Sequence, residues 1–339
     1  MPQSPLDQIA LTFAPVLAQK VTLEWKAADQ VAPLTYAGAL RDVADNVTEL
    51  FAHVNNPNYE IPNAAEVYYS VCETTTHFFV VYAVYHVFDW WKRLKADNLY
   101  DLIRDRFDEH AHDMEGALVV VRKAPQLVVD GLVTVAHNNF YLFTEPQLPS
   151  AVGEAAPASD TPSLLVAKFN ENVDGRIWLD HDTRRIKLFI ESRGHGIHGD
   201  HAAWGSGDEL WYYRPAGEQG DPAKLNVAEK AKRTVRVRDY RLVDLFADSG
   251  VWDHRFDTRV FRQRDDGRWG FVCYSKLTTG LRNKASSANP PWSWNDHNDT
   301  SPLGELATDP AAFITRYAQG WGPVSRQYVV NPYLKIGTT

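Results

Sequence analysis

Three stretches in the first half of the chain are dense in β-branched and aromatic residues. They cover 67–71, 78–85 and 117–121 and read VYYSV, FFVVYAVY and ALVVV. These runs are short and lack helical periodicity, so they predict strands, the first two of which are buried on both faces of a sheet. The chain is also rich in aromatic residues, with 11 Trp, 15 Tyr and 15 Phe, which favours β structure, so we expect a mainly β protein.

Turn signals separate further strand-like runs. Asp130-Gly131 and Asp266-Gly267 are pairs that tight hairpins prefer, and the second pair lies between runs at 259–262 and 269–274. Two more runs, 176–180 and 186–191, are joined by a polar turn, and strands do not alternate regularly with helices. The pattern favours an antiparallel β-sandwich with peripheral α-helices. The stretch 146–162, rich in Ala, Ser, Gly and Pro, is interpreted as an exposed insertion.

Helical spacing is confined to short segments. We expect helices over 6–19 and 40–51, a bridging helix over 97–103 and a last helix over 308–317. The length is compatible with one elaborate domain over 1–339. Within it, 1–60 is expected to be helical padding, 61–280 the sandwich core, and 281–339 a lid with the last helix.

Charge and hydropathy argue against several classes of protein. The 339 residues carry 43 acidic side chains against 35 Lys and Arg, and the basic stretch 230–238 is interpreted as an edge strand, so nucleic acid is not an expected partner. The longest apolar run, 78–88, is too short to cross a bilayer, so no transmembrane segment is expected. The first 18 residues lack the pattern of a secretory leader, which predicts a cytoplasmic protein. Cys72 and Cys273 are expected to be buried free thiols.

The sequence HAHDMEG at 110–116 is the strongest candidate for chemistry. Alternation along a strand places Asp113 and Glu115 on one face and His112 on the other, and His110 can reach the carboxylates from the preceding loop. Two neighbouring carboxylates repel each other unless a proton or a cation intervenes. The segment therefore predicts a divalent cation site. Oxygen ligands suit Ca²⁺ or Mg²⁺, and an imidazole ligand shifts the preference toward Mn²⁺, Zn²⁺ or Fe²⁺. The alternative is a polar cluster without a metal.

A second histidine-rich stretch, GHGIHGDH at 194–201, follows a predicted strand. Its glycines allow the backbone to approach a ligand closely, so His195 is a candidate general base or metal ligand. His198 is a candidate substrate contact, although an exposed loop without function is the alternative for it and for His201. His137, in the turn after a strand, is a further candidate contact.

Other polar and aromatic residues allow more than one interpretation. Trp292 and Trp294 can stack on a sugar ring, or they can belong to a lid packed on the sandwich. His77 and His86 lie beside or inside apolar strands and are interpreted as core histidines. The sequence contains no Gly-x-Ser-x-Gly elbow, phosphate loop or dinucleotide fingerprint, which argues against those reaction classes.

Three segments, 11–17, 110–115 and 190–196, resemble known families in the same order along the chain. They are similar to the vacuolar-sorting-associated family of fungal proteins and, more distantly, to the necrosis-inducing proteins. The latter carry a Gly-His-x-His-Asp-Trp-Glu heptad on a β-sandwich. In this chain Glu109 replaces the glycine and Met114 replaces the tryptophan.

This resemblance implies a set of site residues. In the necrosis-inducing proteins, the residues that match His110, Asp113 and Glu115 line a calcium or magnesium site with an aspartate at the end of the preceding strand. Asp89 is the matching aspartate here, with 105 and 108 as alternative positions. The vacuolar-sorting relatives carry a glycine-flanked histidine at the position of His195, which favours a functional role for this residue.

Two functions follow from these observations. The first is a metal-dependent hydrolase of a polar ester, glycoside or phosphoester, with His195 or His112 as the proton carrier. The second is a non-catalytic module, lectin-like or cytolysin-like, in which the cation orders loops around a glycan, a lipid head group or another small molecule. A metal-free interaction domain is a third alternative.

Overall fold

The computed structural model describes residues 4–62, 64–90, 110–147, 173–180, 183–199, 208–217, 234–273, 284–285, 288–297, 301–317 and 323–337. The helix expected over 97–103, most of the insertion at 146–162 and His201 lie outside these residues.

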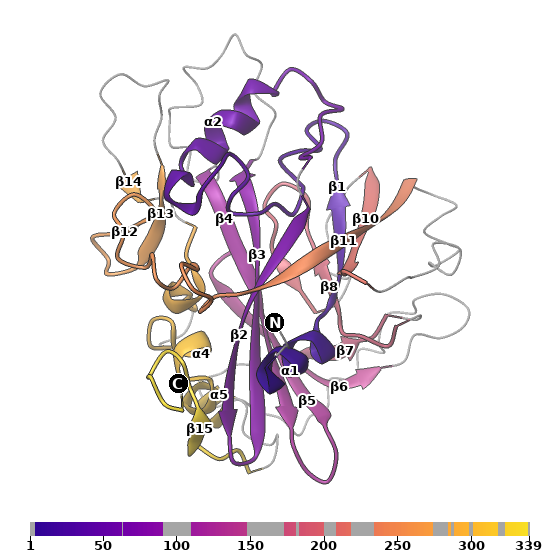
Figure 1. Ribbon diagram of the computed structural model, residues 1–339. Helices are drawn as coiled ribbons and strands as arrows, with labels where there is room; N and C mark the ends of the chain where they lie inside the picture. The colour runs from indigo at the N-terminus through magenta and orange to yellow at the C-terminus, as the bar shows by residue number, and fades with distance from the viewer. Residues whose placement is uncertain are drawn as a thin grey trace.

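One mixed sheet of twelve strands dominates the fold (Figure 1). Its order is β7-β6-β5-β4-β3-β2-β11-β10-β1-β8-β9, and β15 pairs with β2 from outside this path. The strands are β1 Val16–Val21, β2 Ala65–Thr74, β3 His77–Asp89, β4 His110–Arg122, β5 Val128–Ala136, β6 Asn139–Gln147, β7 Val173–Trp178, β8 Lys187–Ile190, β9 Ile197–His198, β10 Glu209–Pro215, β11 Thr234–Asp244 and β15 Tyr328–Val330.

Smaller elements surround this sheet. A second sheet consists of β12 Phe261–Gln263, β13 Trp269–Cys273 and β14 Lys284–Ala285. The α-helices are α1 Pro5–Phe13, α2 Asp45–Ala52, α4 Glu305–Thr308 and α5 Pro310–Tyr317, and 3-10 turns cover Leu40–Asp42 and Pro291–Ser293. Figure 1 shows α4, α5 and β15 gathered on one side of the long strands, with β1, β8 and β10 on the other.

The long strands β3 and β4 are buried on both faces, as their apolar runs predicted. One face, which includes Val119, packs against residues of β1, β8, β9 and β10, so the curled sheet closes on itself. The opposite face, which includes Val120, packs against the segment 25–61, α5 and β13. The prediction of a mainly β, sandwich-like fold with peripheral helices is therefore confirmed.

The sheet is not antiparallel throughout. Parallel pairs join β1 to β8, β6 to β7, β10 to β11, and β11 to β2. A parallel pair needs a long connection between its strands, and hairpin signals in the sequence do not reveal such connections. The basic stretch 230–238 was interpreted as an edge strand, and this interpretation is wrong. The stretch leads into β11, which lies between β10 and β2 inside the sheet.

Two local predictions also need correction. The segment 1–60 is not purely helical padding: α1 ends at Phe13, before Pro15, and β1 then enters the sheet. Asp130 and Gly131 lie within β5 rather than at a hairpin turn, next to an irregularity in the pairing of β4 with β5. By contrast, the hairpin between β12 and β13 is confirmed, and Gly267 adopts the positive φ of 86° that this turn requires.

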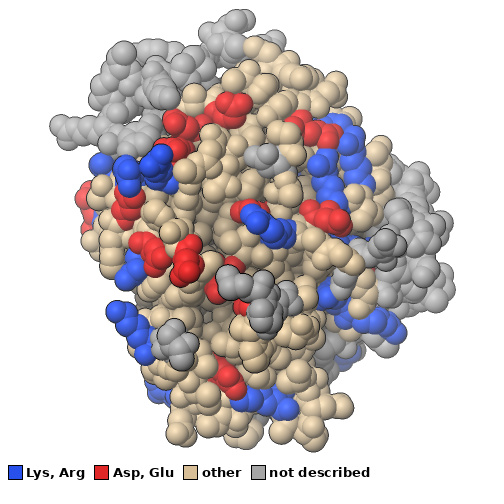
Figure 2. All heavy atoms as spheres, in the orientation of Figure 1, with Lys and Arg blue, Asp and Glu red and all other residues tan. Residues whose placement is uncertain are grey.

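The two cysteines differ in burial. Cys72 is buried, as predicted, whereas Cys273 is only half-buried, and the two form no disulfide. Figure 2 shows acidic and basic side chains interspersed over the described atoms of one face, without a broad basic stripe there. None of the helices in the described ranges combines the length and the hydropathy needed to cross a bilayer.

Candidate functional site

Strands β3 and β4 bring the predicted carboxylates beside histidines of the neighbouring strand. Their antiparallel register pairs His86 with Asp113, and Asp89 with His110. Asp113 and Glu115 are 5% and 8% exposed, so both carboxyl groups are withdrawn from bulk water. The end of this strand pair therefore holds several titratable groups in a region of low dielectric constant.

The loop after β8 adds His195 to this group. Its ring stacks on the ring of His86 with a centroid distance of 3.9 Å and an interplanar angle of 3°. His195 Nδ1 lies 3.4 Å from Asp113 Oδ2, and His195 Nε2 lies 3.5 Å from Asp29 Oδ1. Burial lowers the pKa of His195, but the two carboxylates outweigh this effect and raise the pKa to about 10. His195 and Asp113 are thus brought together from distant parts of the chain.

Asp29 orients His195 and is itself held by four donors. The Thr22 N–H and hydroxyl group donate to Oδ2, and the Trp90 indole and the Arg193 N–H donate to Oδ1, over 2.7 to 3.0 Å. These contacts fix the carboxylate where it faces His195 Nε2. A proton on Nε2 can therefore point at Asp29. With the raised pKa, Nδ1 carries a second proton that points at Asp113, and a metal ion bound at Nδ1 would displace that proton.

The protonation of His86 follows from Gln19. The side-chain nitrogen of Gln19 donates to the carbonyl oxygen of Glu191 over 3.2 Å, so its amide oxygen is the atom 2.9 Å from His86 Nε2. His86 therefore carries its proton on Nε2 and keeps a lone pair on Nδ1. Burial, together with the neighbouring His195, lowers the pKa of His86 well below its usual value. The ring is neutral, as a metal ligand must be.

His86, Asp113 and His195 form what we call the trio, because one ligand atom from each lies within 4.8 Å of the other two. Asp113 Oδ2 is buried and has no hydrogen-bond partner within the described part of the chain. An unpartnered buried carboxylate oxygen is costly, and a cation would satisfy it. Two imidazole nitrogens and one carboxylate oxygen fit Zn²⁺, Mn²⁺ or Fe²⁺ better than Ca²⁺ or Mg²⁺. The residues present therefore fit a metal ion.

Glu115, expected as a metal ligand, instead joins two loops. Its Oε1 accepts the backbone N–H of His137 over 2.6 Å, and its Oε2 accepts the backbone N–H of Ile197 over 3.2 Å. Burial raises the pKa of Glu115, and the charge of Asp113 adds to the shift. Because both oxygens are engaged, Glu115 ties the turn after β5 and the start of β9 to β4.

His110 and Asp89 form a pair at the edge of the trio. His110 Nε2 lies 3.2 Å from Asp89 Oδ2, and His110 Nδ1 donates to the carbonyl oxygen of His112 over 2.6 Å. Burial raises the pKa of Asp89 to about 6, and the charge of Asp113 contributes, although His110 opposes the shift. Of the four predicted ligands, the structure places only Asp113 within the trio, with Asp89 and His110 beside it and Glu115 bound to backbone.

His112, expected as a proton carrier, lies on the opposite face of the sheet. Its Nε2 donates to the carbonyl oxygen of Val272 over 3.1 Å, and its Nδ1 accepts the Tyr85 hydroxyl over 2.6 Å. Asn46 donates in turn to the Tyr85 hydroxyl over 3.1 Å. Burial lowers the pKa of His112 to about 3. Both nitrogens of His112 are engaged and the residue has no exposed surface, which fits a structural role; its assignment as a proton carrier stays a prediction.

Exposed polar groups lie at the mouth of the site. His137 Nε2 is 3.0 Å from Glu191 Oε2, and the His137 side chain is 46% exposed. His198, expected as a substrate contact, is buried, and its Nε2 holds the other Glu191 oxygen over 2.7 Å. Burial raises the pKa of Glu191, but these two histidines outweigh it and lower the pKa to about 2. His137 and Glu191 therefore form a partly exposed ion pair, and the buried His198 holds the second oxygen of Glu191.

Glycines determine where the His137 ring lies. A Cβ on Gly194 would lie 2.7 Å from His137 Cε1, and a Cβ on Gly196 would lie 2.8 Å from His137 Nε2. Five of the eight described non-glycine residues with positive φ also flank this region, namely His112, His137, Asn138, Arg193 and His195. Left-handed backbone costs energy for such residues and concentrates at functional sites.

The two tryptophans do not form an exposed stacking platform. Trp294 is 2% exposed, and its indole nitrogen donates to the carbonyl oxygen of Met114 over 2.9 Å. Trp292 is half-buried and packs edge-on against Trp252 and Phe261, with centroid distances of 5.2 Å. Both indoles belong to the face of the sheet that carries His112. The alternative interpretation, a packed lid, describes them better than sugar stacking.

Sequence reasoning missed three residues of the site. Asp29 lies in an irregular segment without any strand or helix signal, and Gln19 lies in a strand that was expected to be helical. His86 was interpreted as a core histidine, and it is indeed buried. His86 lies in an apolar strand that is buried on both faces. A polar side chain in such a strand must have a partner, so this position could have identified His86 as a candidate site residue.

Comparisons with known proteins extend the sequence resemblance only in part. No family model and no curated protein matches the chain, so the vacuolar-sorting resemblance finds no support. Similar solved structures include necrosis and ethylene inducing protein 2 from the causal agent of cocoa's witches' broom disease, with 16% identity over 61% of this chain and 71% of that chain and a TM-score of 0.29. NLPPya in complex with mannosamine shows 15% identity over 60% and 71%, with a TM-score of 0.30. The non-toxic HaNLP3 shows 13% identity over 61% and 73%, with a TM-score of 0.29. These neighbours are necrosis-inducing proteins, but such low TM-scores carry no argument about this site or its activity.

Proposed function

We propose that this chain binds a divalent transition-metal ion through the trio and that this centre supports a module for binding glycans. His86 Nδ1, Asp113 Oδ2 and His195 Nδ1 would hold the ion, which would supply a fixed positive charge beside the carboxylates. Asp29 would hold His195 in the required tautomer through Nε2.

The observation that carries this proposal is the buried, unpartnered Oδ2 of Asp113 within reach of two imidazoles. Asp89 and Glu115 add carboxyl groups nearby; burial raises the pKa of both, and the charge of Asp113 adds to each shift. A cation held by Asp113 would offset this charge.

Burial favours binding over hydrolysis. A catalytic metal needs a coordination position that a substrate can reach. His86, Asp113 and His195 are 1%, 5% and 0% exposed, which suits a cation that orders the surrounding loops. The His137 side chain is 46% exposed and pairs with Glu191, which is 23% exposed; an imidazole and a carboxylate side by side can each exchange hydrogen bonds with sugar hydroxyl groups.

The metal half of the proposal is tested by thermal unfolding of chelator-treated protein with added Zn²⁺, Mn²⁺ or Ca²⁺. We expect Zn²⁺ or Mn²⁺ to raise Tm, because a ligand that binds only the folded state stabilises it, and elemental analysis to find one ion per chain. The Asp113→Asn variant should lose the shift. His77→Gln is the matched control, because His77 is also a buried histidine of β3 that faces a carboxylate, Asp130, at 3.3 Å, and this variant should keep the shift. Equal shifts in both variants, or none in the native protein, would contradict the proposal.

The glycan half is tested by titrating mannosamine into the metal-loaded protein. We expect saturable binding that the His137→Ala variant weakens about tenfold, the equivalent of about one charge-assisted hydrogen bond. Nitrophenyl glycosides and phosphate esters serve as the second arm of the test. Turnover that depends on the metal and on His195 would overturn the binding module in favour of the hydrolase.

A further inference from the structure

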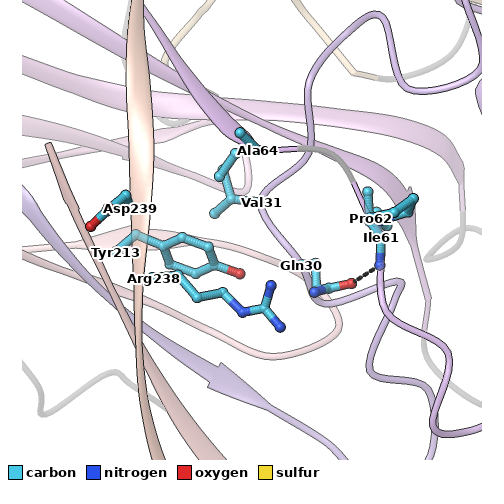
Figure 3. Close-up of a pocket in the computed structure, with 9 residues that line it drawn as sticks. Gln30, Val31, Ile61, Pro62, Ala64, Tyr213, Arg238 and Asp239 are labelled. Atoms are coloured by element: carbon cyan, nitrogen blue, oxygen red, sulfur yellow. Dashed lines mark hydrogen bonds between the residues drawn. The ribbon is translucent and has the colours of Figure 1, made fainter. Parts of the chain in front are cut away.

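A cavity of about 300 Å³ lies between β10, β11 and the irregular segments at 30–31 and 61–65 (Figure 3). Val31, Ile61 and Pro62 contribute apolar walls. The polar lining comes mainly from Gln30, Tyr213 and Arg238, and none of these three residues belongs to the trio or to its exposed mouth.

Tyr213 presents a buried hydroxyl group to this cavity. The residue is 1% exposed; the backbone N–H of Val31 faces its hydroxyl oxygen, and no described residue accepts the hydroxyl proton. Figure 3 shows this hydroxyl pointing toward Arg238 and Gln30. Burial raises the pKa of Tyr213, so the phenol keeps its proton and can donate. A buried hydroxyl proton without an acceptor is a cost that a ligand acceptor would remove.

Arg238 supplies a second donor from the neighbouring strand, because the parallel register pairs it with Tyr213. One terminal nitrogen of its guanidinium pairs with Glu60, and the group lies 4.3 Å from the centroid of the Trp211 ring, so it is held in place. Its Nε is buried and has no hydrogen-bond partner in the described ranges. One N–H of a fixed cation is therefore free for a ligand.

Gln30 supplies the third donor. Its amide oxygen accepts the backbone N–H of Ile61 over 2.5 Å, which assigns the oxygen to that side and turns the amide nitrogen toward Tyr213 and Arg238 (Figure 3). Figure 3 also shows the Asp239 carboxylate pointing away from these donors. Among the described side chains, Tyr213, Arg238 and Gln30 thus direct three donors into the cavity, and no carboxylate points there.

The surrounding charges are close to balance. Arg236 and Arg238 share Glu60, and Arg236 and Lys26 share Glu209, while Asp239 also lines the cavity. A bound anion would therefore be held by the three donors that face the cavity and not by a net positive charge of the cluster.

We propose that this cavity binds a small organic carboxylate, held by Tyr213, Arg238 and Gln30, with its apolar part against Val31 and Ile61. The hydroxyl, the guanidinium Nε and the amide nitrogen donate to the carboxylate oxygens. This is a second site, and its ligand chemistry is independent of the proposed metal and glycan.

Calorimetric titration of the full chain with benzoate, and with benzamide as its neutral analogue, tests the proposal. We expect saturable binding of benzoate at least tenfold tighter than that of benzamide. Tyr213→Phe should weaken benzoate binding about tenfold and lower the Tm of the ligand-free protein only slightly, because the hydroxyl proton has no acceptor in the ligand-free protein. Arg238→Gln should abolish the preference for benzoate. Arg236→Gln is the matched control, because it removes a cation that shares Glu60 but does not line the cavity, and it should keep the preference.

Several results would overturn the assignment. The cavity is not a carboxylate site if benzoate fails to saturate the native protein or if benzamide binds equally well. Unchanged benzoate affinity in Tyr213→Phe would also reject it. A large loss of Tm in the ligand-free Tyr213→Phe variant would show that the hydroxyl is structural, which likewise overturns the proposal.

Discussion

His112 and Asp113 are adjacent in β4, yet the two faces of the sheet give them opposite environments. His112 has both ring nitrogens hydrogen-bonded, to Tyr85 and to Val272. Asp113 has a buried carboxylate oxygen without a hydrogen-bond partner among the described residues, and a histidine from a distant loop lies 3.4 Å from it. Burial is almost complete for both side chains. The comparison shows that two adjacent and equally buried polar residues differ in unsatisfied bonding capacity, which is the property on which the proposed metal site depends.

The largest effect is expected on the satisfied face. His112→Ala removes the partners of the Tyr85 hydroxyl and the Val272 carbonyl and leaves a cavity, so we expect the free energy of unfolding to fall by about 3 kcal/mol. Urea denaturation measures this change. The metal-dependent rise in Tm should persist in the same variant. If the rise disappears while stability is preserved, the division between the two faces is wrong.

A second variant tests the same face at Trp294. Trp294→Phe loses the hydrogen bond to the Met114 carbonyl and part of the packing over Gly116, where a Cβ would lie 2.5 Å from the indole. We expect a loss of about 2 kcal/mol in unfolding free energy, measured by denaturation, with unchanged mannosamine affinity. Weakened sugar binding at unchanged stability would restore the stacking role expected from the sequence.

On the other face, Gly196→Ala would displace the His137 ring. The new Cβ would lie 2.8 Å from His137 Nε2 and 3.2 Å from the Ala136 Cβ. We expect a loss of about 1 kcal/mol of stability, since the His137–Glu191 pair is partly exposed, together with weaker mannosamine binding. In a His137→Ala background the same substitution should cost much less. An equal cost in both backgrounds would locate the strain in the backbone instead.

The smallest effect is a pH dependence of the His137–Glu191 pair. The pKa of His137 is raised from 6.5 to about 10, so its stabilising contribution is complete below pH 6.5 and is lost as the pH rises toward 10. The pKa of Glu191 is lowered from 4.5 to about 2, so its contribution is complete above pH 4.5 and is lost as the pH falls toward 2.

The difference in unfolding free energy between the native protein and His137→Gln should therefore be greatest between pH 4.5 and 6.5. We expect it to reach about 1 kcal/mol there, because His137 is half exposed and solvent screens the pair. Denaturation at a series of pH values measures it. A difference that grows above pH 8 would contradict the assigned charges.

The strand pattern predicted the face of each residue in β4, because a period of two depends only on neighbouring positions. It placed Asp113 and Glu115 opposite His112, and the structure agrees. It did not predict the partners of Glu115, since both are backbone N–H groups of other loops. The type of a side chain in the sequence gives no information about which backbone amides will reach it.

Long-range contacts account for most of what the sequence did not reveal. Asp29 accepts the N–H of Arg193, which is 164 positions away, and neither residue lies in a regular element. Parallel pairing of β1 with β8 brings these regions together. The sequence contains no turn signal that predicts this pairing, because parallel strands are not joined by a tight turn. The ligand atoms of His86 and His195 could therefore not be assigned to one site from the sequence alone.

The strands that bring the trio together determine the stage of folding at which it can form. β3 and β4 bring His86 to Asp113, but Asp29 and His195 reach them only when β1 and β8, neighbours toward one end of the sheet, have paired. A nascent chain that stops before β8 would offer two of the three proposed ligands, and its Asp29 would have no His195 to orient. Ion capture would consequently report completed folding, and a partly synthesised or clipped chain would remain unable to retain metal.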